Sequence, residues 1–392
     1  MNTRRRLPLV PALLALLLAV SATVPAVAAP ASILEDAAFR TDVQAGLDRL
    51  YSMDFAGAQA AFAKVEERYP GHPAGPFLGA LVPWWNLLLD PENSSLDAGV
   101  TSAMDEVLKR SRARLRKNPD DLDGLFFETG ALAFRARVAT YRNRWYRAAQ
   151  DGRRSLRNLR RLHRRDPHNP DLLFGLGLFD YLADVVPQRY KFLRPVAALF
   201  PKGDRVRGLG ELEKAASTGH FVQTEARFAL YQIYDRFEKN RGQAAANLLW
   251  LRGRYPENAL FHVAEGRHYA LQARWAEASL ILQEVAGRQV EGLPGYTGSV
   301  AQEALYWLAR GEMATRNYNS ALQYLDRLEF LAAERLYDRY YQAVGRLRRG
   351  MAYDALGRRA EAERCYREVL RMEGASDARD RAKEFLQKPY QG

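Results

Sequence analysis

Residue types that commonly carry catalysis are sparse in this chain, and only one group of them stands close together. The stretch "HVAEGRH" places His262, Glu265 and His268 at positions i, i+3 and i+6. On a helix the first two can share a face, but His268 lies about 240° round the axis from His262. This is not the His-Glu-x-x-His pattern of a zinc hydrolase. We interpret these residues as polar positions on a helix and predict no metal site.

The single cysteine and the glycine motifs give no catalytic signal either. Cys365 has no His near it in the sequence, which favours a small buried residue over a nucleophile. The sequence contains no phosphate-binding, dinucleotide-binding or nucleophile-elbow glycine pattern and no CxxC. Gly175 and Gly177 stand in an apolar helical run, where they would permit close helix packing. The sequence therefore predicts no catalytic residue and no cofactor. An enzyme assembled from distant residues is the alternative left open.

Arginine gives the strongest compositional signal. From Arg135 to Asp166 there are twelve Arg and two Asp. On a helix over 143–164, four of these arginines share a face beside an apolar stripe, and we name them the Arg ridge: Arg153, Arg157, Arg160 and Arg164. A second row lies on another face: Arg147, Arg154, Arg161 and Arg165. The ridge is either a solvated face or a docking surface for an acidic protein, anionic lipid or anionic glycan. Nucleic acid is not the expected partner behind a signal peptide.

A spacing that recurs along the chain predicts the elements that position these residues. Two examples have an aromatic, a small residue three places on, and large apolar residues four and seven places after that: "RWAEASLILQEV" (Trp275, Ala278, Leu282, Val285) and "NYNSALQYLDRL" (Tyr318, Ala321, Leu325, Leu328). The last three positions form one stripe of a helix. A preceding helix carries a glycine and an aromatic three places later, as at Gly266 and Tyr269. The alanine is small because the paired helices cross there.

These blocks resemble tetratricopeptide repeats (TPRs), which are helix pairs of 34 residues. Matching blocks cover Thr41–Pro70 and, nearly continuously, Val222–Leu370. The resemblance implies an all-α fold, a right-handed α-α superhelix (TPR-like solenoid) of about eight helix pairs. Between Pro73 and Gly219 the repeats are degenerate, and the helices before Pro167 are several residues too long. The block Tyr231–Phe261 faintly resembles a eukaryotic TPR family that includes the Iml2 protein, and no function is inferred from that.

The expected segments follow from these patterns. Residues 1–28 have a basic start, an apolar stretch and small residues before the cut, as in a secretory signal peptide; an uncleaved anchor is the alternative. No Cys follows the cut, so a lipoprotein anchor is excluded. The rest is expected to divide into an N-terminal repeat (29–72), degenerate repeats with the Arg-rich helices (73–219), a regular array (220–372), and a capping helix and tail (373–392).

An inserted loop is expected over 185–202, within the degenerate repeats. It is apolar and basic and contains Pro187, Pro195 and Pro201. Long ordered loops in compact domains are often functional. The insertion is expected to enter a membrane interface, to cross the concave groove, or to pack back on the helices.

The resemblance also implies where a partner would bind, because the first helix of each TPR pair lines the concave surface. The matching positions are Ile233, Arg236, Phe237, Val263, Arg267, Tyr306, Arg310, Met313, Leu347 and Met351. Arginine and aromatic residues are favoured at binding hot spots, and the other positions would serve packing between repeats. The chain thus resembles a bacterial exported TPR protein. The function expected is a non-enzymatic scaffold in the periplasm or outside the cell that binds a protein or peptide. The alternative is a peripheral envelope protein that binds anionic lipid or polysaccharide through the Arg ridge.

Overall fold

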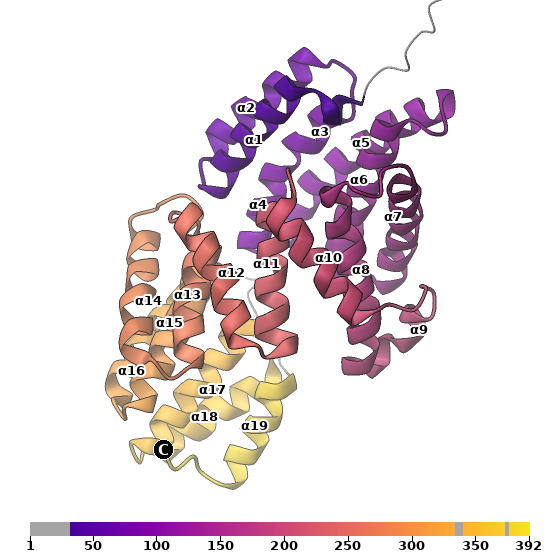
Figure 1. The fold of residues 1–392 in the computed structure, drawn as a ribbon. Coiled ribbons are helices and arrows are strands. Elements are labelled where there is room, and N and C mark those ends of the chain that lie inside the picture. The colour runs from indigo at the N-terminus through magenta and orange to yellow at the C-terminus, as the bar shows by residue number, and fades with distance from the viewer. Residues whose placement is uncertain (1–31, 334–339, 373–375) are drawn as a thin grey trace, which may run out of the picture.

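The structure is a computed structural model that describes residues 32–333, 340–372 and 376–392. Within these ranges every regular element is a helix and none is a strand. Consecutive helices pack as pairs, and the pairs stack into a curved array (Figure 1). The predicted fold class, an all-α TPR-like solenoid, is confirmed. The proposed signal peptide, residues 1–28, lies outside the described residues.

The pairs follow one another along the chain. They are α1 (Ala37–Tyr51) with α2 (Phe55–Arg68); α3 (Ala74–Gly79) and α4 (Leu81–Leu89) with α5 (Asp97–Lys117); α6 (Leu122–Tyr141) with α7 (Trp145–Arg165); α8 (Pro170–Arg189) with α10 (Arg205–Thr218); α11 (Gln223–Ile233) with α12 (Arg241–Arg254); α13 (Ala259–Leu271) with α14 (Trp275–Val290); α15 (Gly298–Ala314) with α16 (Tyr318–Ala333); and α17 (Tyr340–Ala355) with α18 (Arg359–Arg371). Helix α19 (Ser376–Gln387) packs on the last pair. Among the described helices, none has both the length and the apolar character needed to cross a membrane.

Local chemistry sets where these helices begin and end. The side chain of Asp54 accepts a hydrogen bond from the Gly57 N–H at 2.9 Å, and Asn258 accepts one from the Leu260 N–H at 3.1 Å. Such caps satisfy backbone donors that have no partner within the helix. Helix α12 ends one residue before Tyr255, which precedes Pro256. A residue before proline is disfavoured in the helical conformation, so the helix stops there.

The first helix of the second pair is broken, because α3 ends at Gly79 and α4 begins at Leu81. Pro83 stands four residues after Gly79. A proline has no N–H to donate to the carbonyl four residues earlier, and its ring clashes with that carbonyl. The break therefore places Pro83 in the first turn of α4, where a missing donor is tolerated.

The connection between α8 and α10 differs from the inserted loop predicted over 185–202. Residues 185–189 are helical, because α8 continues to Arg189 with Pro187 inside its last turn. The loop prediction is wrong for these residues: Pro187 weakens the helix only at its end, and α8 stops two residues later. A short 3-10 turn, Lys191–Leu193, and α9 (Arg194–Ala197) follow, and α9 packs against α7 and α8.

The small residues of the repeat are buried where paired helices meet. Ala278 is 1% exposed and Ala321 is fully buried, as the spacing predicts. On the facing helix, a Cβ added to Gly266 would lie 2.5 Å from Cδ2 of Leu282. One buried apolar cluster runs from Ile33 to Leu331, so the two halves share a core.

The first pair also contacts the second half of the chain. The side chain of Asn258 donates to the Tyr51 carbonyl at 2.8 Å, and Tyr255 donates its hydroxyl to Asp48 at 2.8 Å. Thr297 donates to the Leu89 carbonyl at 3.0 Å. The superhelix is thus wound tightly enough for α1 and α4 to meet the region from α12 to α15 (Figure 1).

Candidate protein-binding surfaces

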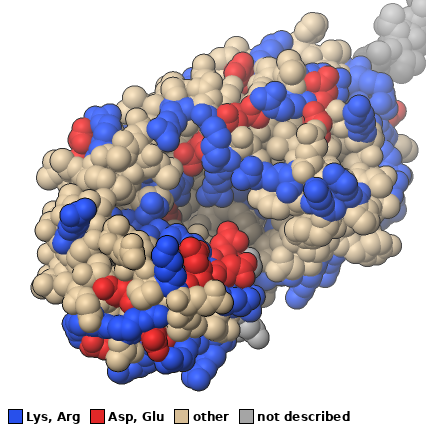
Figure 2. Space-filling view, turned by 90° about the horizontal axis from the view of Figure 1, so that it is seen from below, with Lys and Arg blue, Asp and Glu red and all other residues tan. Residues whose placement is uncertain are grey.

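In the C-terminal half, the first helix of each pair lies in the inner layer of the array. Helices α13, α15, α17 and α19 each pack on the next, whereas the backbones of the second helices α14, α16 and α18 lie farther from one another. In a curved stack the elements on the concave side approach one another most closely, so these first helices line the groove. Figure 2 shows a hollow near the centre of the molecule, bordered by both acidic and basic side chains.

A ladder of polar side chains links the inner helices. Arg267 on α13 donates to Glu303 on α15 at 2.5 Å and to the Tyr231 hydroxyl on α11 at 2.9 Å, and each of these partners is 36 residues away in sequence. Burial raises the pKa of Tyr341 on α17, and the nearby Glu303 carboxylate raises it further. Side chains from the first helices of four successive pairs are therefore joined along the groove.

Beyond this ladder, three arginines gather at the C-terminal end of the groove, and we name them the groove arginines: Arg310 on α15, Arg348 on α17 and Arg381 on α19. Burial lowers the pKa of Arg310, and the positive charges of the other two lower it further. The guanidinium of Arg310 lies 4.3 Å from the centre of the Trp307 ring, and that of Arg381 lies 5.2 Å from the Phe385 ring. In the described part of the chain, none of the three forms an ion pair with a carboxylate.

The structure separates the predicted groove residues into two groups. Five are buried between helices: Ile233, Val263, Met313, Leu347 and Met351. The other five are partly or fully exposed: Arg236, Phe237, Arg267, Tyr306 and Arg310. Of these, Arg267 belongs to the ladder, and Phe237 packs against Tyr181 with ring centres 6.2 Å apart. The remaining two of this group that carry a ring and a charge together, Tyr306 and Arg310, lie side by side at the C-terminal end of the groove.

Sequence reasoning missed Glu303, Tyr341, Arg348 and Arg381. The repeat pattern gave no signal for the ladder, because aligning Ala278 with Ala321 makes Arg310, not Glu303, the equivalent of Arg267. Arg381 carried no signal either, because the capping helix lacks the repeat pattern. Arg348 follows the predicted position Leu347 directly and lies about 100° further round that helix.

The two arginine rows of α7 differ in their partners. In the second row, Arg161 and Arg165 pair with Asp120 at 3.2 and 2.6 Å, and Arg154 lies 3.7 Å from Glu128. All four arginines of the Arg ridge are exposed. Arg160 lies 5.8 Å from the Phe179 ring, and no member of the ridge forms an ion pair within the described residues.

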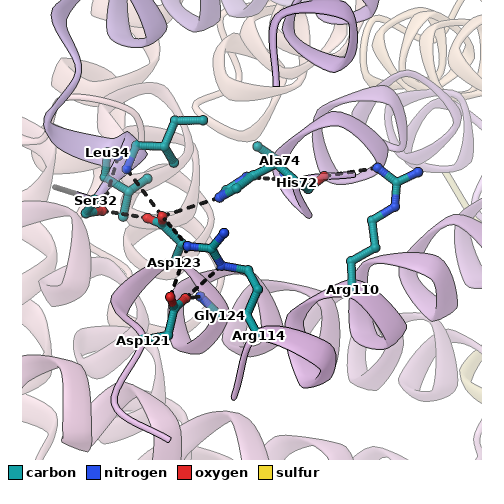
Figure 3. Close-up of polar contacts among 10 residues, drawn as sticks. Ser32, Leu34, His72, Ala74, Arg110, Arg114, Asp121, Asp123 and Gly124 are labelled. Atoms are coloured by element: carbon teal, nitrogen blue, oxygen red, sulfur yellow. Dashed lines mark hydrogen bonds and ion pairs between the residues drawn. The ribbon is translucent and has the colours of Figure 1, made fainter. Parts of the chain in front are cut away.

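A polar network holds the start of the described chain (Figure 3). Asp123, at the start of α6, accepts from the Ser32 hydroxyl at 2.6 Å and lies 3.3 Å from Nε2 of His72. Burial raises the pKa of Asp123, but the hydrogen bonds from His72 and Ser32 outweigh burial and leave that pKa lowered. Nδ1 of His72 accepts from the Ala74 N–H at 3.2 Å. Both ring nitrogens are thus engaged, and the arrangement is structural.

The residues of "HVAEGRH" are likewise engaged in packing. Nδ1 of His262 lies 2.9 Å from the Tyr296 hydroxyl, and burial lowers the pKa of His262 to about 3. Glu265 accepts from Arg252 at 2.8 Å. His268 and Glu265 border a cleft of about 240 Å³ between α12 and α13, and burial lowers the pKa of His268. Cys365 is buried, and burial raises the pKa of its thiol.

Comparison with known proteins agrees with the helix-pair architecture. Residues 171–333 match the model of the family described as Iml2/Tetratricopeptide repeat protein 39. A search of curated proteins found no significant match. Among solved structures, the crystal structure of yeast Tom70 is similar, with 12% sequence identity, coverage of 86% of this chain and 78% of that chain, and a TM-score of 0.37. The paired helices and the family match over residues 171–333 support a tetratricopeptide-repeat protein.

Proposed function

We propose that this protein is an exported, non-enzymatic scaffold that binds a protein or peptide partner through its concave groove in the cell envelope. The observation that carries the proposal is the set of groove arginines on three successive inner helices, beside Tyr306 and Trp307. Repeat arrays of this kind use their extended concave surfaces for binding. Arginine and aromatic side chains are also enriched at the energetic centres of interfaces.

The groove arginines favour a partner segment with acidic side chains. Arg310 is held beside two like charges in a partly buried place, and this lowers its pKa. An anionic group in the same place would relieve the repulsion and accept hydrogen bonds from the planar guanidinium groups. The ladder would stiffen the groove floor, because each of its members is held by a neighbour on the next helix.

The experiment is affinity capture from the envelope fraction with a groove variant and a matched control. The double variant Arg310→Gln/Arg348→Gln removes two charges from the groove, and Arg153→Gln/Arg157→Gln removes two from α7. We expect the groove variant to bind the captured partner at least about tenfold more weakly, and the α7 variant to bind as the wild type does. Equal capture of the same partner by both variants would show that the groove is not its binding site.

A further inference from the structure

We propose that the protein carries a second docking surface, formed by α7 and the connection from α8 to α10, that binds the surface of an anionic lipid bilayer. It is separate from the groove and goes beyond the proposed scaffold function. Two observations support it: cationic side chains that have no carboxylate partner within the described residues, and exposed aromatic side chains beside them. We name this area the α7 face and define it by the Arg ridge together with Tyr146, Tyr190, Phe192 and Leu199.

The first observation is the contrast between the two rows of α7. Three members of the second row have carboxylates within ion-pair distance on neighbouring segments. The Arg ridge has none within the described residues, although it stands on the same helix. If the Arg ridge were only a solvated face, ion pairs with the acids that serve the second row would stabilise it, because like charges at i and i+4 repel. The unpaired ridge is instead available to an external anion.

Exposed aromatic and apolar residues are the second observation. Tyr146 is 70% exposed and Phe192 is 67% exposed, which is unusual for rings of that size. Phe192 lies 6.1 Å from the Trp145 ring and 6.3 Å from the Tyr190 ring. Lys191 and Arg194, also exposed, flank it. Rings and cations thus alternate on the connection itself.

The Arg ridge and the exposed aromatic residues lie on one side of the molecule. Tyr146 precedes Arg153 by seven residues, or two helical turns, so the two share a face of α7. The connection packs beside that face, since Phe200 lies 3.4 Å from where a Cβ of Gly152 would stand. In Figure 1, α7 and α9 form the outer edge away from the C-terminal array, and Figure 2 shows basic side chains on that same right-hand side as well as elsewhere.

A bilayer fits this combination better than other anions do. Anionic headgroups attract nearby Arg and Lys side chains, and aromatic rings favour the depth of the headgroups. A soluble polysaccharide or an acidic peptide would meet the charges but would leave Phe192 and Leu199 in water. Stable attachment to a membrane usually needs more than one signal, and here charge and apolar contact are both present.

The test is co-sedimentation of the purified mature chain with vesicles of phosphatidylcholine alone or with phosphatidylglycerol added. The ridge variant replaces Arg153, Arg157, Arg160 and Arg164 with Gln. A control variant replaces Arg147, Arg154, Arg161 and Arg165 with Gln, which removes the same charge from the same helix. Circular dichroism confirms folding, which we expect to persist because all eight arginines lie at the surface.

We expect the wild type to bind only the anionic vesicles, the ridge variant to bind at least about tenfold more weakly at low salt, and the control to stay within about threefold of the wild type. The variant Phe192→Ser should also weaken binding to the anionic vesicles. Raising the salt concentration should not reproduce this loss, because the contact removed is apolar. No binding by the wild type would overturn the proposal, as would equal losses in the two four-Gln variants. The proposal would also be overturned if the wild type bound heparin, a soluble polyanion, as well as it binds the anionic vesicles, and if Phe192→Ser had no effect on binding. Because the groove residues are intact in every variant, capture of the envelope partner tests the scaffold function independently.

Discussion

The guanidinium of Arg267 and the carboxylate of Glu303 face each other at 2.5 Å across two successive inner helices, and the side chain of each is only 16% exposed. The pair is flanked by Tyr231 on one side and Tyr341 on the other. The packing of α13 on α15 thus places a charged pair, not an apolar contact, between the two helices. Such a pair fixes the position of one repeat against the next.

Breaking this pair should destabilise the fold. Arg267→Met leaves Glu303 partly buried without its partner, and we expect a loss of about 3–5 kcal/mol in the free energy of unfolding. The control is Arg274→Met, because Arg274 and Glu277 form a pair that is 50% and 45% exposed; an exposed ion pair contributes little to stability, so its loss should be much smaller. Denaturant unfolding measures both. Losses of similar size would show that the ladder is not a buried interaction.

Ala278 tests the crossing of α13 and α14. It is 1% exposed, and Ala278→Leu would force the helices apart or push Leu282 out of its place. We expect a loss of about 1–3 kcal/mol and a lower melting temperature. Ala276→Leu, on the neighbouring surface of α14, is the comparison and should be nearly neutral. An unchanged melting temperature for Ala278→Leu would contradict the register.

His262 should make stability depend on pH. Burial lowers its pKa from 6.5 to about 3, so the unfolded chain binds a proton between these values that the native chain does not. Stability from this group is therefore fully present above pH 6.5 and falls as the pH falls towards 3, by up to about 1.4 kcal/mol per pH unit. Urea unfolding of the wild type and His262→Asn between pH 4.5 and 7.5 gives the difference. Parallel curves would contradict the assignment.

Export makes a simple prediction about the N-terminus. If residues 1–28 are a signal peptide, the protein isolated from the envelope begins near Ala29. N-terminal sequencing measures this directly, and an intact Met1 on envelope protein would refute cleavage.

Local spacing was enough to predict the helix pairs, because each apolar stripe must face its neighbours. Ala278 and Ala321 lie where their positions in the stripe placed them. The spacing could not predict how tightly the array winds. Tyr51 meets Asn258 across 207 residues, and that contact depends on the sum of many small rotations between pairs.

The candidate binding surfaces were predictable only in part, for a related reason. Periodicity separated the two arginine rows of α7, but the acids that pair with the second row come from other segments, at Asp120 and Glu128. Likewise, Ile233 and Val263 share the groove register but are buried. Which positions stay open depends on how closely neighbouring helices approach, and the pattern of one helix does not contain that information.

The most direct test of groove binding is site-specific photo-crosslinking in the native envelope. One photoreactive residue replaces Tyr306, beside the groove arginines, and another replaces Leu280, which is 73% exposed on the second helix α14. We predict that the position 306 probe gives a discrete adduct with one partner, which Arg310→Gln/Arg348→Gln abolishes, and that the position 280 probe does not. An adduct with the same partner from position 280, and none from position 306, would contradict binding through the concave groove.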